Sequence, residues 1–222
     1  MAGWLNWAFN VFPTLRPCLN NFYPKMTGPF NPHRSIKVNN AIREDFLWAL
    51  YHLKRSSGIR LLRATNWDPI SADITVYCDA CPAGMGFWYP ILDKAYYSPT
   101  PPDAASSIIF YFETLCVYCA LIDAASKASS GSRVVIFTDN LNTVSIYNSL
   151  SCLPVFNPLL RASMDILIDN DLDLRVLHVK GEENETADAL SRSQFATALN
   201  LSPRISIQPF QPPLWTLGAA GL

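Results

Sequence analysis

The feature that most limits the fold of this chain is the order of strand and helix patterns between residues 74 and 193. Short runs rich in β-branched and aromatic residues predict strands at 74–78, 84–89, 94–97, 133–138 and 174–179. Longer apolar patterns predict helices at 106–127, 141–150, 159–169 and 184–193. Three sequential strands form an antiparallel meander, whereas strands joined through helices run parallel. The sequence therefore predicts an α/β fold whose five-stranded mixed sheet has its first, fourth and fifth strands parallel, with helices on both faces.

Two further regions flank this pattern. Residues 1–70 carry nine Lys or Arg against three acids, and the rest of the chain carries eight against fifteen, so a net charge of −1 divides into +6 and −7. Apolar residues recur at helical spacing over residues 39–56. We therefore expect a basic, helical segment at 1–70, the α/β domain at 71–195, and a proline-containing tail or linker at 196–222.

Composition and the longest apolar run exclude several classes of protein. Half of the residues are hydrophobic and only 16% are charged, which is not the composition of a disordered chain. The stretch 108–122 is interrupted by Glu113 and is shorter than the ~20 residues that a membrane span needs. The first dozen residues lack the basic start and cleavage site of a secretory signal. We expect an intracellular protein, cytoplasmic or nuclear, with no membrane partner.

Two Cys-x-x-Cys pairs raise the question of zinc. They are Cys78 with Cys81 and Cys116 with Cys119. Zinc ribbons separate such pairs by about 15 to 20 residues and place them on turns. Here the gap between the pairs is longer, and the second pair falls inside the predicted helix 106–127. We therefore expect small buried thiols and no zinc.

Two acids follow predicted parallel strands, at the edge of the sheet where ligands and catalytic groups gather. Asp79 follows the first strand and Asp139 follows the fourth. Taken singly, each is also explained as a turn former, or as part of the cap of the helix that begins at Leu141. Position alone therefore leaves the role of each acid open.

Two more acids lie on predicted helices. Glu113 has only apolar residues three and four positions away, so no cation on its own helix neutralises it, and a buried unpaired carboxylate is costly. Asp188 has the simpler explanation of an exposed pair with Arg192, four residues later. Together with the acids at the strand ends, they form a set of oxygen ligands that could hold two Mg²⁺ ions across a scissile phosphate.

Four motifs carry a resemblance to a known family. They are residues 76–80 with Gly84-Met85-Gly86, Glu113 followed by Leu115 and Ala120-Leu121, Thr138-Asp139-Asn140, and residues 178–192. The last motif includes G-x-x-N-x-x-A-D-x-L-S-R and is the most specific. Through these motifs residues 73–193 resemble the ribonuclease H domain of retrotransposon reverse transcriptases. Residues 3–8, Arg16-Pro17 and the 39–56 helix are similar to the segment that joins polymerase to ribonuclease H in gypsy-like and DIRS-like elements.

The resemblance implies a ribonuclease H fold and metal-dependent hydrolysis of the RNA strand of RNA/DNA hybrids. It implies two Mg²⁺ ions, for which Mn²⁺ can substitute. The family's catalytic and metal-binding acids match Asp79, Glu113, Asp139 and Asp188, with Asp79 as the bridging ligand. The sequence has no Y-x-D-D polymerase motif. The chain therefore resembles a fragment or a domesticated remnant, whose partner would be the missing polymerase portion.

The chain departs from cellular ribonucleases H just before the last helix. Those enzymes have a flexible loop with a histidine there, whereas here only Glu182-Glu183 separates Gly181 from Asn184. This departure predicts a lower turnover. His178 lies within a strand pattern, and we interpret it as a core or edge histidine.

Substrate binding needs phosphate contacts, which the basic segment can supply. The candidates are Lys25, Arg34, Lys37, Arg43, Lys54, Arg55, Arg60 and Arg63. The alternative explanation is that these side chains form an ordinary solvated surface and bind no ligand. Asn140 and Asn142 are candidates for contacts with the 2′-hydroxyls that distinguish RNA.

Two alternative functions remain open. One is a nucleic-acid- or protein-binding module that kept the fold and lost turnover, against which the full set of four acids argues. The other is a transposase or integrase of the same fold, which takes its third acid from the last helix and has no Glu in the first. Glu113 favours the nuclease.

Overall fold

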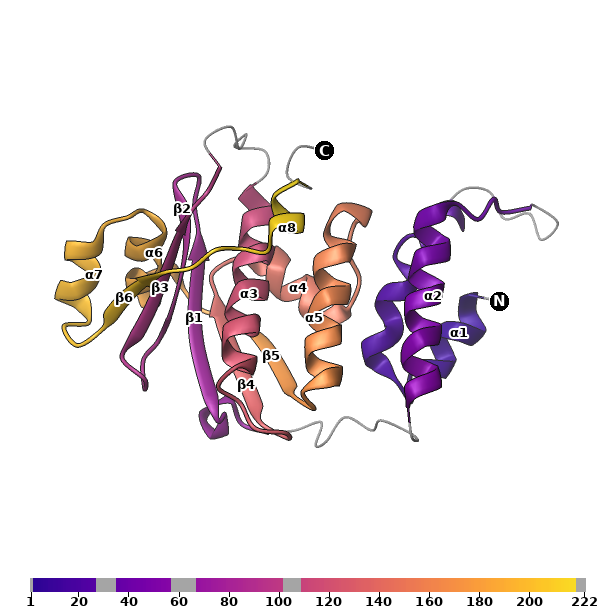
Figure 1. Ribbon diagram of the computed structural model, residues 1–222, viewed down its shortest axis with the longest axis horizontal. Coiled ribbons are helices and arrows are strands. Elements are labelled where there is room, and N and C mark those ends of the chain that lie inside the picture. The colour runs from indigo at the N-terminus through magenta and orange to yellow at the C-terminus, as the bar shows by residue number, and fades with distance from the viewer. Residues whose placement is uncertain (1, 27–34, 57–66, 102–108, 219–222) are drawn as a thin grey trace.

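The computed structural model describes residues 2–26, 35–56, 67–101 and 109–218, and its described strands form one six-stranded mixed sheet in the order β5-β4-β1-β2-β3-β6 (Figure 1). The strands are β1 (Ile74–Ala80), β2 (Gly84–Tyr89), β3 (Lys94–Pro99), β4 (Arg133–Thr138), β5 (Asp173–His178) and β6 (Ser206–Pro209). Strands β1, β4 and β5 run parallel, and β1, β2 and β3 form the antiparallel meander. The predicted α/β architecture, a mixed sheet with an antiparallel meander and parallel strands, is confirmed, with one more strand than expected.

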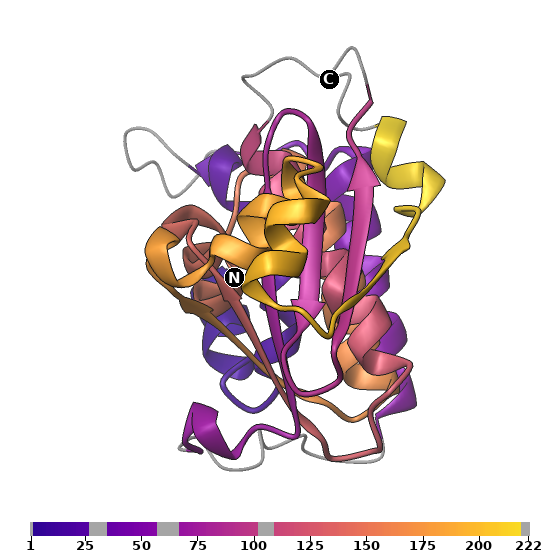
Figure 2. The same cartoon turned by 90° about the vertical axis from the view of Figure 1, so that its left-hand side faces the viewer.

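Helices cover both faces of the sheet. The α-helices are α1 (Ala2–Ala8), α2 (Asn40–Arg55), α3 (Ile109–Ala125), α4 (Leu141–Ser149), α5 (Asn157–Asp169), α6 (Glu185–Ser191), α7 (Phe195–Leu201) and α8 (Leu214–Gly218). Helices α3, α4 and α5 lie on one face, and α6 and α7 lie on the other, in front of the sheet in Figure 2. No helix in the described part of the chain is both long and apolar enough to cross a bilayer.

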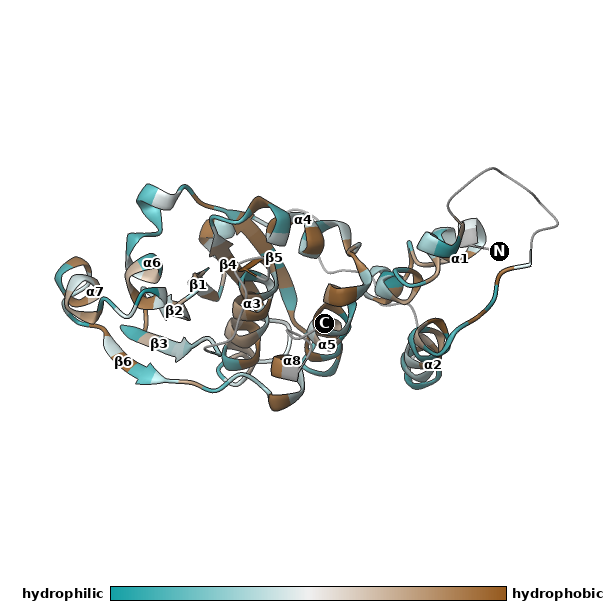
Figure 3. Cartoon of the chain, turned by 90° about the horizontal axis from the view of Figure 1, so that it is seen from above, coloured by the Kyte–Doolittle hydropathy of each residue, from teal (hydrophilic) through white to brown (hydrophobic). Residues whose placement is uncertain are grey.

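The first long helix of the domain, α3, is the centre of the core. It is buried from Tyr111 through Leu121, and Figure 3 shows it hydrophobic along its length between the sheet and α5. A helix that is apolar on all sides must be covered on all sides, and the sheet and α5 both pack against it. The expected start of this helix at residue 106 lies outside the described residues. Glu113 is therefore carried into the most buried layer of the molecule.

The register of the parallel strands aligns two of the candidate acids. Tyr77 of β1 pairs with Phe137 of β4. Two residues further along each strand bring Asp79 level with Asp139. The two side chains therefore reach the same end of the sheet, as the predicted parallel pairing requires.

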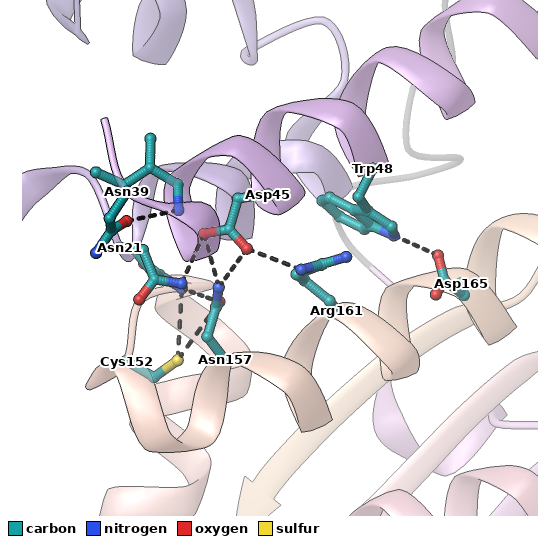
Figure 4. A network of polar contacts seen from close by, with 10 residues as sticks. Asn21, Asn39, Asp45, Trp48, Cys152, Asn157, Arg161 and Asp165 are labelled. Atoms are coloured by element: carbon teal, nitrogen blue, oxygen red, sulfur yellow. Dashed lines mark hydrogen bonds and ion pairs between the residues drawn. The ribbon is translucent and has the colours of Figure 1, made fainter. Parts of the chain in front are cut away.

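The N-terminal segment packs against α5 at the side of the molecule away from the sheet (Figure 1). It contains α1, α2 and two 3₁₀ helices, Pro13–Leu19 and Tyr23–Met26. Figure 4 shows a polar network between α2 and α5, in which the buried carboxylate of Asp45 binds Asn157 and Arg161. Asp165 of α5 accepts hydrogen bonds at 2.6 Å from the Trp48 indole and the His52 ring.

The C-terminal residues extend the sheet, although their sequence has no strand or helix period. Strand β6 pairs in parallel with β3, and α8 packs on α3, where the Tyr111 hydroxyl donates to the Thr216 carbonyl at 2.7 Å. A four-residue strand that ends in Pro209 is too short to produce a recognisable alternation, and proline is tolerated because β6 is an edge strand. The expected five-stranded sheet is corrected to six strands for this reason.

Candidate metal centre

Three carboxylates from three different elements converge at one end of the sheet. Asp79 lies in β1 near its carboxyl end, Asp139 follows β4, and Glu113 comes from α3. One oxygen of each carboxylate lies within 4.8 Å of those of the other two. Asp79 and Glu113 are 4% and 6% exposed, and Asp139 is the most accessible of the three. These acids form an oxygen-lined group with the spacing that a metal ion requires.

Glu113 points into this group and not into hydrocarbon. Its carboxylate accepts a hydrogen bond from the backbone N–H of Ala80, while its Oε2 atom is buried and has no hydrogen-bond partner. Burial raises the pKa of Glu113 to about 9, and the charges of Asp79 and Asp139 add to the rise. A buried carboxylate oxygen without a donor is costly, so this atom is the clearest open ligand position in the group.

Asp79 is held by a hydroxyl from the other face of the sheet. Ser191 of α6 donates to Asp79 Oδ2 at 2.6 Å. Burial raises the pKa of Asp79 to about 7; the Ser191 hydrogen bond opposes the rise, and the charges of Asp139 and Asp188 add to it. In the absence of a cation, the ionised forms of these neighbouring acids therefore destabilise one another.

A divalent cation fits this donor set. Carboxylate oxygens are the ligands that Mg²⁺ and Mn²⁺ prefer. Burial, with a further contribution from the neighbouring acids, raises the pKa of Asp79 and Glu113, and a bound positive charge would favour their ionised forms. The unpartnered Oε2 of Glu113 would gain a partner. The residues present therefore match a hard divalent cation in chemistry and in spacing.

Asp188 lies at the rim of the group and is not one of the three converging acids. Its Oδ1 atom accepts from Arg192 Nε at 2.7 Å, and its side chain is 42% exposed. The ion pair proposed as its simple explanation is thus present. Asp188 is nevertheless close enough to raise the pKa of Asp79.

Glycines explain how α6 comes so close to the sheet. A Cβ atom at Gly86 would lie 2.5 Å from Leu190 Cβ and 2.9 Å from the backbone nitrogen of Ser191. The amide of Asn184 also donates to the Cys78 carbonyl at 3.1 Å, which ties the start of α6 to β1. The glycine pair of the opening motif therefore has a steric role, because it admits the helix that carries Asp188.

Ser191 is a site residue that sequence reasoning missed. Two signals could have found it: Ser191 is the serine of the L-S-R ending of the closing motif, and its spacing of three residues from Asp188 places both on one face of α6. Serine is also a common surface residue of helices, so the spacing alone does not point to a buried contact. Only the packing of α6 on β2 brings the hydroxyl to Asp79.

The two asparagines proposed for RNA contacts lie beside the cluster. Asn140 directly follows Asp139 and caps α4, since its side chain accepts from the Thr143 backbone N–H at 3.0 Å. Asn142 is exposed in the first turn of that helix. Asn140 therefore caps α4, as its position before the helix suggests, and Asn142 is accessible to a ligand.

The proposed basic contacts lie apart from the acids. Arg43, Lys54 and Arg55 are exposed on α2, which is on the opposite side of the molecule from α6 (Figure 1). The guanidinium of Arg55 stacks on the Tyr51 ring, 4.8 Å from its centroid. Lys25 and Lys37 are also exposed, and the candidates Arg34, Arg60 and Arg63 lie outside the described residues.

His178 lies at the sheet edge, and the cysteines are free thiols. His178 is exposed at the end of the edge strand β5, paired in register with Thr138. All six cysteines are free thiols, and those of the two Cys-x-x-Cys pairs are buried. Cys116 Sγ lies 3.3 Å from the Asp79 carbonyl oxygen, directly beneath the acidic group.

Comparison with known proteins finds likenesses among solved structures. No protein-family model matches the chain. No curated protein matches it either. Among solved structures, the chain is similar to the N-terminal RNase H domain of a Mycobacterium tuberculosis protein, determined as a fusion with maltose-binding protein. The two share 14% sequence identity with a TM-score of 0.42, over 59% of this chain and 100% of that one.

Proposed function

We propose that this protein is a metal-dependent endonuclease that hydrolyses the RNA strand of RNA/DNA hybrids. The observation that carries the proposal is the convergence of Asp79, Glu113 and Asp139 within 4.8 Å, at the carboxyl ends of parallel strands. The unpartnered Oε2 of Glu113 supports a cation as the missing partner. Mg²⁺ is the proposed ion, with Mn²⁺ as a substitute.

In this proposal each acid has its own part. Asp79, Glu113 and Asp139 would hold the cation or cations, and Asp188 would add a fourth carboxylate at the accessible rim. A bound divalent cation supplies a more acidic coordinated water and stabilises charge on the phosphate. Asp79, which accepts a hydrogen bond from Ser191 and lies close to Glu113 and Asp139, would be a central ligand of the metal centre. Arg192 donates to Asp188 Oδ1 and orients this carboxylate.

We propose that the substrate is an RNA/DNA hybrid because of the sequence motifs that surround these acids. Asn140 and Asn142, next to Asp139 in the chain, are the proposed contacts to ribose 2′-hydroxyls. Arg43, Lys54 and Arg55 are proposed to contact phosphates further along the duplex. These residues lie on the far side of the molecule from α6, so a duplex that contacts them must extend across the molecule from the acidic group.

The wider context is proposed on the same motifs. Residues 71–195 would be the ribonuclease H-like domain of a retrotransposon reverse transcriptase. Residues 1–70 would be its connection-like segment. Residues 196–222 are expected from the sequence to be a tail, but strand β6 within them extends the sheet of this domain. The polar network between α2 and α5 supports a fixed arrangement of the first two (Figure 4). The polymerase portion would be the natural partner.

The test is cleavage of labelled RNA within an RNA/DNA hybrid, with RNA/RNA and DNA/DNA duplexes as comparisons. Mg²⁺ or Mn²⁺ should support cleavage of the hybrid, and chelation should stop it. Asp79→Asn should lower the rate by more than the roughly 10- to 100-fold typical of residues that only support a ligand. Asp169→Asn, an exposed acid at the end of α5, is the matched control and should leave the rate unchanged.

A second candidate function is a hybrid-binding module with little or no turnover. The observation that favours it is the Asp188–Arg192 ion pair, which occupies one oxygen of the fourth acid. The short connection before α6, which replaces a histidine-containing loop, points the same way. Tight hybrid binding without cleavage in either metal would select this function over the nuclease.

A further inference from the structure

Ser191 is tightly packed where α6 meets the sheet. Its side chain is completely buried. A Cβ atom at Gly86 would lie 2.9 Å from its backbone nitrogen, and a Cβ atom at Gly84 would lie 2.9 Å from its carbonyl oxygen. Cys81 Sγ contacts the same carbonyl at 3.2 Å. The backbone of this residue is therefore packed on several sides, and its side chain has little freedom to move.

The single hydroxyl hydrogen of Ser191 has two acceptors within reach. Asp79 Oδ2 lies at 2.6 Å and the Asp188 carbonyl oxygen at 2.8 Å. The carbonyl already accepts from the backbone N–H of Arg192 at 3.1 Å. A hydroxyl has one donor hydrogen, and bonds to a carboxylate are shorter and stronger than bonds to a neutral oxygen. Ser191 therefore donates to Asp79.

We infer that Ser191 is a positioning residue of the metal centre. Its hydroxyl holds the Asp79 carboxylate so that an oxygen of Asp79 stays close to the carboxylate oxygens of Glu113 and Asp139. The inference rests on the proposed function. Asp79 contacts both sides of the centre, because its carboxylate lies near those of Glu113 and Asp139 and also accepts from Ser191 of α6. Without the Ser191 hydrogen bond, Asp79 would be free to rotate away from the other two ligands. Groups that orient metal ligands typically affect metal affinity by roughly 10- to 100-fold.

The test uses Mn²⁺ as the probe and measures its binding to the full chain by calorimetry and by electron paramagnetic resonance, without substrate. Ser191→Ala should weaken Mn²⁺ binding by at least roughly 10-fold, with an unchanged circular dichroism spectrum. The matched control is Ser163→Ala. Ser163 is also completely buried and donates to a helix carbonyl, that of Leu159, at 2.9 Å, but it lies in α5. It should bind Mn²⁺ as the unmodified protein does.

If Ser191→Ala folds and binds Mn²⁺ with the same affinity as the unmodified protein, the inference is overturned. If that variant does not fold, Ser191→Cys replaces it, because the thiol keeps a side chain in place while donating only weakly. Weakened Mn²⁺ binding by this variant supports the inference, and unmodified binding overturns it. Equal weakening by Ser163→Ala would also overturn it, since the effect would then come from general loosening of the core.

Asp79→Asn separates this inference from the proposed function. If Asp79→Asn binds Mn²⁺ as well as the unmodified protein does, the metal centre itself is wrong. If Asp79→Asn loses Mn²⁺ while Ser191→Ala keeps it, only the positioning role is wrong. If both lose Mn²⁺ and the unmodified protein cleaves no hybrid, the positioning role stands and the nuclease proposal falls.

Discussion

The side-chain amide of Asn157 donates hydrogen bonds to both carboxylate oxygens of Asp45, at 3.1 Å to each. Arg161 donates to the same carboxylate at 2.9 Å, and Asn21 donates to it at 2.8 Å (Figure 4). Asp45 is fully buried in α2, while Asn157 and Arg161 belong to α5. One carboxylate thus joins the N-terminal segment to the helical layer behind the sheet.

Asp45→Ala should destabilise the protein strongly. The variant leaves the buried amide of Asn157 and the partly exposed guanidinium of Arg161 without their acceptor, and a buried group left without its hydrogen-bond partner typically costs about 1 to 3 kcal/mol. Urea unfolding followed by circular dichroism measures the change. Glu44→Ala, which removes the exposed neighbouring acid, should alter the free energy of unfolding by less than about 0.5 kcal/mol. Similar losses in the two variants would show that the network contributes little.

Gly86→Ala should separate α6 from the sheet. The added Cβ would lie 2.5 Å from Leu190 Cβ and would force the helix outward, at a cost of about 1 to 3 kcal/mol. The same displacement should weaken Mn²⁺ binding, because α6 carries Asp188 and Ser191. Gly3→Ala is the control, since a Cβ there has nothing within 4 Å. If Gly86→Ala has the same free energy of unfolding and the same Mn²⁺ affinity as the unmodified protein, the close packing described for α6 is contradicted.

Glu113→Gln should change how stability depends on pH in the absence of divalent cations. Burial raises the pKa of Glu113 from 4.5 to about 9. An acid whose pKa is raised on folding binds its proton more tightly in the folded state. Its contribution is therefore complete below 4.5 and is lost as the pH rises through about 9. The pKa of Asp79, raised from 3.8 to about 7, acts in the same direction.

The midpoint of urea unfolding, measured in chelator across this range, should therefore fall with rising pH for the unmodified protein. The fall should be smaller for Glu113→Gln, in which that position cannot ionise. Added Mg²⁺ should restore stability at high pH in the unmodified protein and have less effect in the variant. Parallel pH profiles for the two proteins would contradict the placement of Glu113 among the other acids.

Replacement of Arg43, Lys54 and Arg55 by Gln should reduce the salt dependence of hybrid binding. The slope of log affinity against log salt should fall by about 0.9 for each phosphate that the variant no longer neutralises. All three residues are exposed, so folding should be unaffected. Lys94→Gln, which removes an exposed cation at the start of β3, is the comparison. An unchanged slope in the triple variant would remove α2 from the substrate path.

Much of the architecture follows from local patterns in the sequence. The order of β1, β2, β3, α3, β4 and β5 is predicted from periodicity, and right-handed crossovers then decide which strands run parallel. Once that order is known, Asp79 and Asp139 must reach the same edge of the sheet. Glu113 can be singled out because a charged residue in an apolar helix pattern needs a partner from elsewhere. These conclusions need only residue type and spacing.

Other features depend on contacts between residues far apart in the chain, which spacing does not encode. Strand β6 exists because β3 offers it an open edge, and its four residues have no pattern of their own. The hydrogen bond from Ser191 to Asp79 exists because glycines in β2 admit α6. Asp188 pairs with Arg192 and is not one of the three converging acids. The sequence by itself determined which acids reach this end of the sheet, and only tertiary packing decided their distances, their partners and their exposure to water.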